Sequence, residues 1–314
     1  MYQSRLYGSL VNSDRPLFSG LEFDVKAASA PRYQLELLKF KGDATLCFKR
    51  KQRVASPLNF QNLDIETYFY SSHTRELMLY SNREFGPGVF GQPWCFEVKD
   101  VVSFYWLGGH STIYYELGKE GSDALLTFWF THIFLPAYFT LEDMYDFIHA
   151  GAVEIEAKPV LFIAPSTGGK STLTDYFIKQ GHGLISDDKV ATYIEDGRFI
   201  GVPSHPHHRP YRRFEDLGYR VDNMFSRSKP IHAFYALERN EESSEVIITE
   251  IKGFKKFETL LPNYLYSFKY LRAQRLKYLA DMVNNIPIYE VKRPWDMDKL
   301  VEVHNAIVEH SRQL

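Results

Sequence analysis

Short apolar runs separated by turn residues characterise the first 120 residues of the chain. Five of these runs are rich in β-branched and aromatic residues and are bounded by Gly, Pro, Asn or Asp, which is typical of strands. They are residues 33–40, 44–50, 75–81, 101–107 and 112–117. Residues 84–93, EFGPGVFGQP, predict a loop by their composition. The pattern predicts a small, mainly antiparallel β domain over residues 1–135, and it does not indicate the role of that domain.

The most apolar stretch, residues 124–139, raises the question of a membrane segment. It reads ALLTFWFTHIFLPAYF, is interrupted by His132 and Pro136, and is shorter than the ~20 residues that a spanning helix needs. A buried pair of strands is the favoured interpretation. The first 17 residues also lack the apolar core of a signal peptide. We therefore expect a cytoplasmic protein without a membrane segment.

From residue 136 onward, helical and strand-like periods alternate. Thr140 and Asp143 have the spacing of a capping box, which predicts a helix over 140–152. Residues 152–164 read as two strands joined by a tight turn at Ala157–Lys158. Further strands are expected at 184–188, 231–239 and 244–251, and further helices at 171–181, 263–285 and 297–310. The second domain is predicted to be an α/β domain over residues 136–314.

Composition narrows the classes of function. The chain has 314 residues, of which 45% are hydrophobic and 16% aromatic, enough for a packed globular core. A formal net charge of −2 provides no basic field for a phosphate backbone, so nucleic acid is not an expected partner. Two cysteines, Cys47 and Cys95, are too few for a disulfide framework and agree with a reducing cytoplasm.

Residues 161–173, LFIAPSTGGKSTL, carry the clearest chemical signal. An apolar strand leads into a glycine-containing turn and then a helical pattern, with the spacing of a phosphate-binding loop and Ala164 in place of its first glycine. Glycines let backbone N–H groups approach phosphate oxygens, a lysine neutralises the β- and γ-phosphates, and a hydroxyl can ligate Mg²⁺. The residues expected to bind ATP are Ser166, Thr167, Gly168, Gly169, Lys170, Ser171 and Thr172. The competing interpretation is a strand–helix turn that binds no ligand.

Two adjacent carboxylates, Asp187 and Asp188, follow the next apolar strand. A phosphate-loop enzyme needs a carboxylate at the end of a neighbouring strand to hold Mg²⁺, and a second one can accept the proton of an attacking hydroxyl. Neighbouring strand residues point to opposite faces, so both carboxylates reach one site only if the strand ends there. We expect Ser171 and Asp187 to hold Mg²⁺, while the choice of the base between the two aspartates stays open. An ordinary surface turn is the alternative.

Residues 201–218 form a basic segment rich in histidine. It contains three histidines followed by three arginines: His205, His207, His208, Arg209, Arg212 and Arg213. The segment could be a metal site, a solvated basic loop, or a source of arginines for the transferring phosphoryl group or an acidic substrate. The third interpretation is favoured because the segment directly follows the acidic strand, and Arg209 is the first choice within it.

Three motifs share their order and spacing with a known family. His149-Ala150-Gly151-Ala152-Val153, then APSTGGKSTL, then GHGLISDDKV resembles the catalytic domain of HPr kinase/phosphorylase, over residues 140–305. It resembles more closely the wider family of HPr-kinase-like serine kinases, including those that modify lasso-peptide precursors. It departs from HPr kinases proper at Thr172, where they have glutamate, and it has no clear counterpart of the glycine-rich segment that they use in phosphorolysis.

That resemblance implies a phosphate-loop kinase fold of the phosphoenolpyruvate-carboxykinase type. It also implies that the pair Asp187 and Asp188 supplies the proton acceptor and a metal carboxylate, and that His149 lies beside this pair. Without the resemblance, a lone histidine at the end of a predicted helix indicates only a favourable interaction with the helix dipole.

The sequence therefore predicts an ATP- and Mg²⁺-dependent kinase whose acceptor is a hydroxyl, expected to be a serine of a protein or peptide. The residues expected to act in catalysis are Asp188, Asp187, His149, Lys170 and Arg209. Two alternatives stay open, a kinase of a small-molecule alcohol such as a sugar or amino acid, and a non-catalytic nucleotide-binding switch. A homo-oligomer is compatible with the sequence, which does not determine the oligomeric state.

Overall fold

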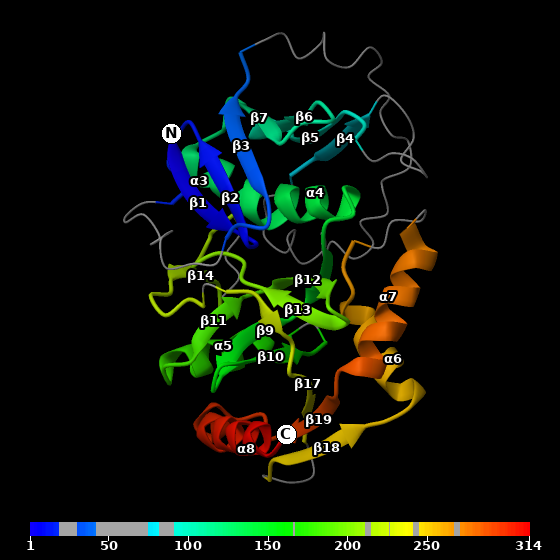
Figure 1. The fold of residues 1–314 in the computed structure, drawn as a ribbon. Helices are drawn as coiled ribbons and strands as arrows, with labels where there is room; N and C mark the ends of the chain where they lie inside the picture. Colours follow the sequence, from blue (N-terminus) through cyan, green and yellow to red (C-terminus); the bar gives the residue numbers. More distant parts are fainter. Residues whose placement is uncertain are drawn as a thin grey trace. The chain divides into compact units, whose positions relative to one another are not determined.

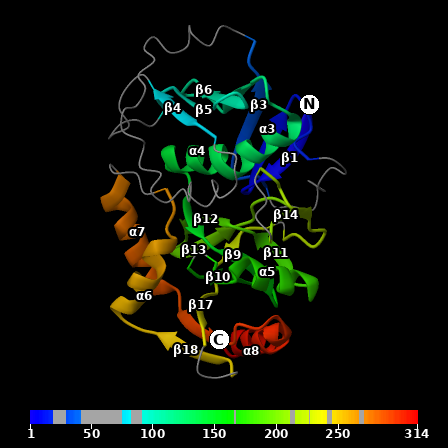
Figure 2. The same ribbon diagram turned by 180° about the vertical axis from the view of Figure 1, so that it is seen from behind.

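The computed structural model describes residues 1–18, 30–41, 75–81, 91–165, 167–210, 215–225, 227–240, 245–266 and 271–314. Within these ranges the chain is a mixed α/β protein with several sheets (Figures 1 and 2). It divides into two compact units. The first comprises Met1–Tyr145, Arg213–Asp216 and Tyr266–Ala273, and the second comprises Asp146–Arg212, Leu217–Leu265 and Gln274–Leu314. The boundary predicted after residue 135 thus falls inside the first unit.

The first unit contains a seven-stranded sheet in the order β1-β2-β3-β7-β6-β5-β4. Its strands are β1 Tyr2–Leu6, β2 Ser9–Ser13, β3 Gln34–Lys39, β4 Leu77–Ser81, β5 Trp94–Val98, β6 Val102–Trp106 and β7 Thr112–Leu117. Strand β3 is parallel to both its neighbours, and the other pairs are antiparallel. Four of the five strands predicted in this region are found. The fifth, at 44–50, lies outside the described residues, as does most of the loop predicted at 84–93.

A helical segment follows the sheet, so the strand pair predicted over 124–139 is wrong. Helix α3 Asp123–Trp129, a π-helical turn at Phe130–Phe134 and helix α4 Leu135–Leu141 continue one another. Ser122 caps the start by accepting a hydrogen bond from the Leu125 backbone N–H at 3.3 Å. Nearly every side chain of the segment is buried, so no polar face marks the helical period, and an apolar run by itself does not distinguish helix from strand.

This segment also corrects the expectation that the apolar stretch is too short to span a membrane. Asp123–Leu141 has 19 residues and a mean hydropathy of 1.4 in its most apolar window, enough to pass for a spanning helix by length and composition. However, 89% of that window is buried inside the protein. Phe134 stacks on Trp94 and Phe104 of the sheet, with ring centroids 5.0 and 4.7 Å apart. The apolar composition is therefore explained by packing in the core of the first unit.

Glu215 closes a hydrogen-bonded cluster in the first unit, and its loss should destabilise the protein. Its carboxylate accepts from the indole N–H of Trp129 at 2.7 Å and twice from the guanidinium of Arg75 at 3.0 Å. The Arg75 and Glu215 side chains are only 19% and 9% exposed. Glu215→Ala leaves these donors without their acceptor, so we expect the free energy of unfolding to fall by about 2 kcal/mol.

Denaturant unfolding measures this change, and Glu120→Ala is the matched control. Glu120 pairs with the same arginine but is 50% exposed, so its loss should change the free energy of unfolding by well under 1 kcal/mol. Equal losses in the two variants would contradict the assignment of Glu215 as the buried acceptor.

The second unit is built on a six-stranded sheet in the order β11-β9-β10-β17-β19-β18. The strands are β9 Gly151–Ile155, β10 Lys158–Ile163, β11 Gly183–Ser186, β17 Ala233–Arg239, β18 Ile247–Ile251 and β19 Ile288–Arg293. The central strands β10, β17 and β19 are parallel, so their carboxyl ends lie at one edge of the sheet. In open α/β sheets, ligands bind at that edge.

Two smaller sheets complete the strands of the second unit. The four-stranded sheet has the order β16-β13-β12-β8, with β8 Asp146–His149, β12 Lys189–Glu195, β13 Arg198–Val202 and β16 Lys229–Pro230. A two-stranded ribbon pairs β14 His207–His208 with β15 Tyr219–Arg220. The chain passes from β11 of the six-stranded sheet directly to β12 of the four-stranded sheet.

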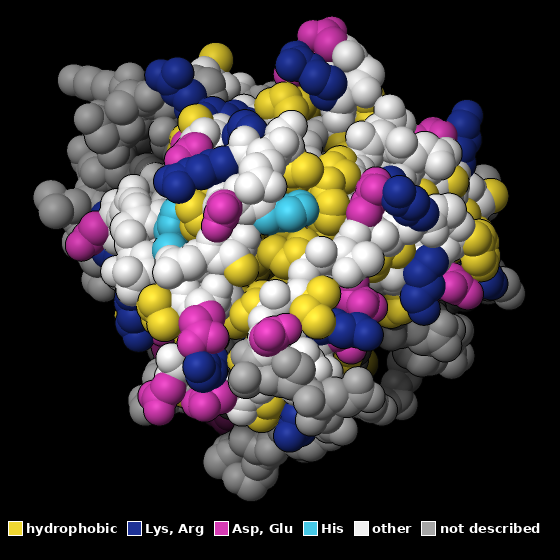
Figure 3. All heavy atoms as spheres, turned by 90° about the horizontal axis from the view of Figure 1, so that it is seen from below, with side chains coloured by type: hydrophobic (Ala, Val, Ile, Leu, Met, Phe, Trp, Pro, Cys, Tyr) yellow, Lys and Arg dark blue, Asp and Glu magenta, His cyan; other side chains and the backbone are white. Residues whose placement is uncertain are grey.

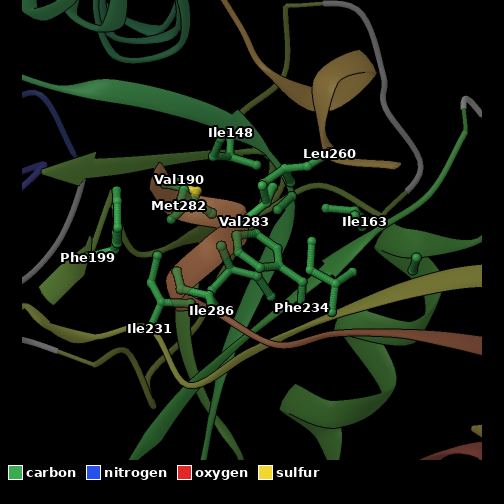
Figure 4. Packing of buried hydrophobic residues seen from close by; sticks show 14 of the residues in the cluster. Ile148, Ile163, Val190, Phe199, Ile231, Phe234, Leu260, Met282, Val283 and Ile286 are labelled. Carbon is green, nitrogen blue, oxygen red and sulfur yellow. The ribbon is translucent and has the colours of Figure 1, made fainter. Parts of the chain in front are cut away.

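Helices cover both faces of the six-stranded sheet (Figures 1 and 2). They are α5 Lys170–Lys179, α6 Phe254–Leu260, α7 Arg272–Asn285 and α8 Leu300–Gln313, with 3-10 turns at Leu261–Asn263 and Met297–Lys299. Helices α5 and α8 pack on one core through residues such as Phe177 and Ile307. The opposite core joins α7 to both sheets, and Figure 4 shows Met282 and Val283 among Ile148, Val190 and Phe234.

The helix predicted over 140–152 is wrong. Thr140 lies in the last turn of α4, where the Glu142 N–H still bonds to the Tyr138 carbonyl, and Asp143 has a left-handed backbone with φ of 52°. Strand β8 follows, so His149 ends a strand. The hairpin turn predicted at Ala157–Lys158 is formed by Glu156 and Ala157, both with positive φ, as a two-residue hairpin loop prefers. The helix predicted over 263–285 is found only from Arg272 onward among the described residues.

Charged side chains of both signs are mixed on the face of the molecule drawn in Figure 3. Lysine and arginine alternate there with aspartate and glutamate around an apolar area. On this face no field of one sign gathers, in agreement with the formal net charge of −2.

Candidate active site

The predicted phosphate-binding loop lies between β10 and α5, at the carboxyl edge of the six-stranded sheet. Gly169 has a φ of 75° and is the residue before the first turn of α5. A Cβ on Gly168 would lie 2.8 Å from the Cβ of Ala164, and one on Gly169 would lie 2.2 Å from Nη2 of Arg293. Both positions therefore require glycine, for close packing at Gly168 and also for backbone conformation at Gly169. Ser166 lies outside the described residues.

Helix α5 packs directly against β9 at Gly151, and Lys170 lies in the first turn of this helix. A Cβ on Gly151 of β9 would lie 2.1 Å from Oγ1 of Thr174 and 3.5 Å from Cγ of Lys170. The glycine thus allows the first turns of the helix to approach the strand. The Lys170 side chain is only 4% exposed. Ser171 and Thr172 follow it in the first turn of α5.

The acidic pair occupies the connection between the two sheets, because β11 ends at Ser186 and β12 begins at Lys189. Strand β11 therefore ends immediately before the two aspartates, which is the condition for both carboxylates to reach one site. Asp188 Oδ1 lies 3.4 Å from Nδ1 of His149 and 4.0 Å from Nζ of Lys170. His149 reaches this position because β8 pairs with β12 in the register that sets it opposite Lys189. The structure thus brings His149, Lys170 and Asp188 together.

Asp187 has a different environment from Asp188. Its Oδ1 lies 2.5 Å from Nδ1 of His208, and its Oδ2 accepts a hydrogen bond from the Arg209 backbone N–H at 3.0 Å. Burial by itself raises the pKa of the Asp187 carboxyl, but the charge and hydrogen bond of His208, with Arg209 nearby, outweigh burial and lower that pKa. Both oxygens of Asp187 are engaged by the protein, so the geometry does not favour its predicted role as a direct metal ligand.

His208 was named in the sequence only as part of the histidine-rich segment, and its contacts in the candidate site were not predicted. It is fully buried, with Asp187 at Nδ1 and Asp175 of α5 at 3.7 Å from Nε2. Asp175 in turn accepts hydrogen bonds from Tyr219 and Lys179, each at 2.6 Å. The sequence shows that the segment is rich in histidine. It does not show that His208 pairs with Asp175, because this contact depends on β14 lying against α5. His208 therefore ties the acidic connection to the helix of the phosphate loop.

The interpretation of residues 201–218 as a solvated basic loop is wrong for its described part. His205, His208 and Arg209 are 3%, 0% and 6% exposed. Among the described residues, no group of three or more His, Cys, Asp or Glu side chains is placed to hold a metal ion, so the metal-site interpretation gains no support. Arg212 and Arg213 lie outside the described ranges. Arg209 approaches Asp187 through its backbone, and the role of its guanidinium at a phosphoryl group stays a prediction.

Buried His205 predicts a pH dependence of stability. Burial lowers the pKa of His205 to about 3, and the nearby charges of His207 and Arg209 act in the same direction. Between pH 6.5 and about 3, the unfolded chain binds a proton at this residue that the folded chain does not bind. Stability therefore falls as pH falls through this window, by up to about 1.4 kcal/mol per pH unit from this residue.

Urea unfolding at pH 7, 6, 5 and 4 measures this dependence. His205→Gln should reduce the loss of stability across these pH values relative to wild type. His110→Gln, a change of an exposed histidine, is the control. If wild type and His205→Gln lose stability in parallel as pH falls, His205 does not account for the dependence.

Arg293 at the end of β19 is a second residue that the sequence did not single out. Its Nη2 donates a hydrogen bond to the carbonyl of Gly168 at 3.0 Å, and burial lowers the pKa of its guanidinium. The residue is 4% exposed. It fixes the glycine pair of the loop from a strand that lies 125 positions away in the sequence. No local sequence pattern reveals this contact, because the two residues are far apart in the chain.

Comparison with known proteins provides a likeness in structure and none in sequence. No family model matches the chain, and no curated protein matches its sequence. Among solved structures, the chain is similar to the Hpr(Ser) kinase/phosphatase from Coxiella burnetii, with 14% sequence identity and a TM-score of 0.32. The match covers 53% of this chain and 97% of that chain. It is a weak link at the level of the fold, and it does not establish the family or the reaction.

Proposed function

We propose that this protein is an ATP- and Mg²⁺-dependent kinase that transfers the γ-phosphoryl group to a hydroxyl, with a serine of a protein or peptide as the acceptor. The observation that carries the proposal is the position of Asp188, with His149 and the loop lysine Lys170 both within 4.0 Å. A carboxylate in this position can accept a proton, and a protein that only binds nucleotide and Mg²⁺ needs no proton acceptor beside its metal carboxylate.

The residues present fit a nucleoside triphosphate and Mg²⁺. The first N–H groups of α5 have no intrahelical partner by helix geometry, and together with the helix dipole they favour bound anions. Lys170 adds a buried positive charge beside them. Mg²⁺, when bound, supplies charge neutralisation at the phosphate oxygens. The Ser171 hydroxyl would hold it, and Asp187 would contribute by accepting from a metal-bound water, since an ionised carboxylate has further lone pairs.

In this proposal Asp188 is the base. The acceptor hydroxyl donates a hydrogen bond to the Asp188 carboxylate and gives up its proton there as its oxygen bonds to the γ-phosphorus. The bond between the γ-phosphorus and the bridging oxygen breaks, and ADP leaves with that oxygen. His149 orients the carboxylate, and Lys170 offsets the negative charge of the transferring group. Asp187, held by His208 and by the Arg209 backbone, positions the connection that carries Asp188.

A transfer assay with γ-labelled ATP and Mg²⁺ tests the proposal. Wild type is offered a library of serine peptides, the same peptides with alanine in place of serine, and a panel of small alcohols. The double variant Lys170→Ala/Asp188→Asn reports any co-purifying kinase. Asp222→Asn, which changes a fully exposed aspartate, is the matched control for the substitution itself.

The expected result is label on serine peptides with wild type and Asp222→Asn, and none with the double variant. Label found only on small alcohols would contradict the proposed peptide acceptor and would still support a kinase. Bound ATP without transfer to any acceptor would contradict the proposal and favour a nucleotide-binding switch.

A further inference from the structure

An exposed tryptophan lies beside the phosphate-binding loop. Trp295 is 50% exposed, although a side chain of this size is usually largely buried in a folded protein. It follows β19 by two residues and precedes α8, so it belongs to the carboxyl edge of the sheet, where ligands bind. A Cβ on Gly169 would lie 3.4 Å from Cη2 of the Trp295 ring. The indole therefore borders the turn at which α5 begins.

Two arginines hold this ring in place. The guanidinium carbons of Arg293 and Arg239 lie 5.1 and 5.7 Å from its centroid. The two arginines end neighbouring parallel strands and are paired directly in register. Cation–π contacts of this kind orient an aromatic ring while half of its surface stays in solvent. Arg293 also binds the Gly168 carbonyl, so one side chain connects the ring to the phosphate loop.

We propose that Trp295 is the platform on which the base of the bound nucleotide stacks. The inference rests on the proposed function, because it takes the triphosphate to lie at the α5 N-terminus. A nucleobase is a flat π-system attached to its phosphates through one sugar, so it lies close to the loop that holds them. A half-exposed indole beside that loop can stack with the base, and the two guanidinium groups over the ring hold it in position. Stacking recognises any base, so this platform strengthens nucleotide binding with little selection between bases.

Nucleotide binding with and without a base tests the platform. Calorimetry measures the affinities of ATP and of inorganic tripolyphosphate, which has no base, for wild type, Trp295→Ala and Trp295→Phe. Trp295→Ala should weaken ATP binding by about 10- to 100-fold and leave the affinity for tripolyphosphate unchanged. Trp295→Phe, which keeps an aromatic face, should retain most of the ATP affinity. Met297→Ala removes a more exposed apolar side chain two residues away and should change neither affinity.

The outcomes separate this proposal from the proposed function. If wild type binds both ligands and Trp295→Ala binds ATP as tightly, the platform is wrong and the kinase proposal stands. If Trp295→Ala weakens ATP and tripolyphosphate equally, Trp295 acts by supporting Arg293 and the loop, and the base-stacking role is overturned. If wild type binds neither ligand, both proposals fail.

Discussion

Asp188→Asn should reduce phosphoryl transfer by about 100- to 10,000-fold, the range that general base catalysis contributes. Asparagine keeps the shape of the side chain but cannot accept the proton of the acceptor hydroxyl. Nucleotide affinity should change little, because the loop and Lys170 stay intact. Steady-state transfer and equilibrium ATP binding, measured on the same preparation, separate these two effects.

Asp187→Asn is the informative comparison, because it makes the same chemical change at the neighbouring position. Asp187 holds His208 and the Arg209 backbone N–H through its two oxygens, and asparagine keeps only one of these acceptors, so one buried donor is left unsatisfied and the charge beside His208 is lost. We expect a lower midpoint of thermal unfolding and a smaller loss of transfer than in Asp188→Asn. The assignment would be reversed if Asp187→Asn abolished transfer at unchanged stability while Asp188→Asn remained active.

Lys170→Ala should weaken ATP binding and reduce transfer at saturating ATP by about 1,000-fold. The ammonium group is buried and lies 4.0 Å from Asp188 Oδ1. Its loss removes charge that offsets the phosphates in the ground state and, more strongly, the charge that develops during transfer. Fluorescence titration with ATP measures the first effect, and single-turnover transfer measures the second.

Lys179→Ala is the control for this lysine substitution. Lys179 lies at the other end of the same helix, and its side chain is 62% exposed in an ion pair with Asp175. It should retain nearly full transfer. A Lys170→Ala variant that binds ATP and transfers phosphate as wild type does would show that the loop does not serve a nucleotide in the proposed way.

Secondary structure was predictable where one face of an element is buried and the other is not. Strands β3 and β7 were found because buried residues alternate with more exposed ones along them. The helix over Asp123–Leu141 was not, because burial on all sides removes its polar face. The helix wrongly predicted at 140–152 shows the limit of capping signals, since Thr140 and Asp143 mark the end of a helix there.

The strand, glycine-containing turn and helix of the predicted phosphate loop could be predicted from the sequence alone, because the requirements of this arrangement are local. Glycines, a lysine and a hydroxyl within eight positions, between a strand and a helix, specify their own backbone. The different surroundings of Asp187 and Asp188 could not be predicted from the sequence, since each carboxylate contacts partners elsewhere in the chain. His149 meets Asp188 through the register of β8 with β12, and His208 meets Asp187 through the ribbon of β14 and β15.

The sequence by itself determined the loop, the acidic pair and the alternation of strands and helices around them, because short-range spacing and periodicity encode such features. Only the tertiary structure decided that Asp188 lies with Lys170 and His149, that His208 holds Asp187, and that Arg293 supports Gly168. These contacts join residues 18 to 125 positions apart. The sheet registers that create them depend on packing across the whole unit, which no local pattern records.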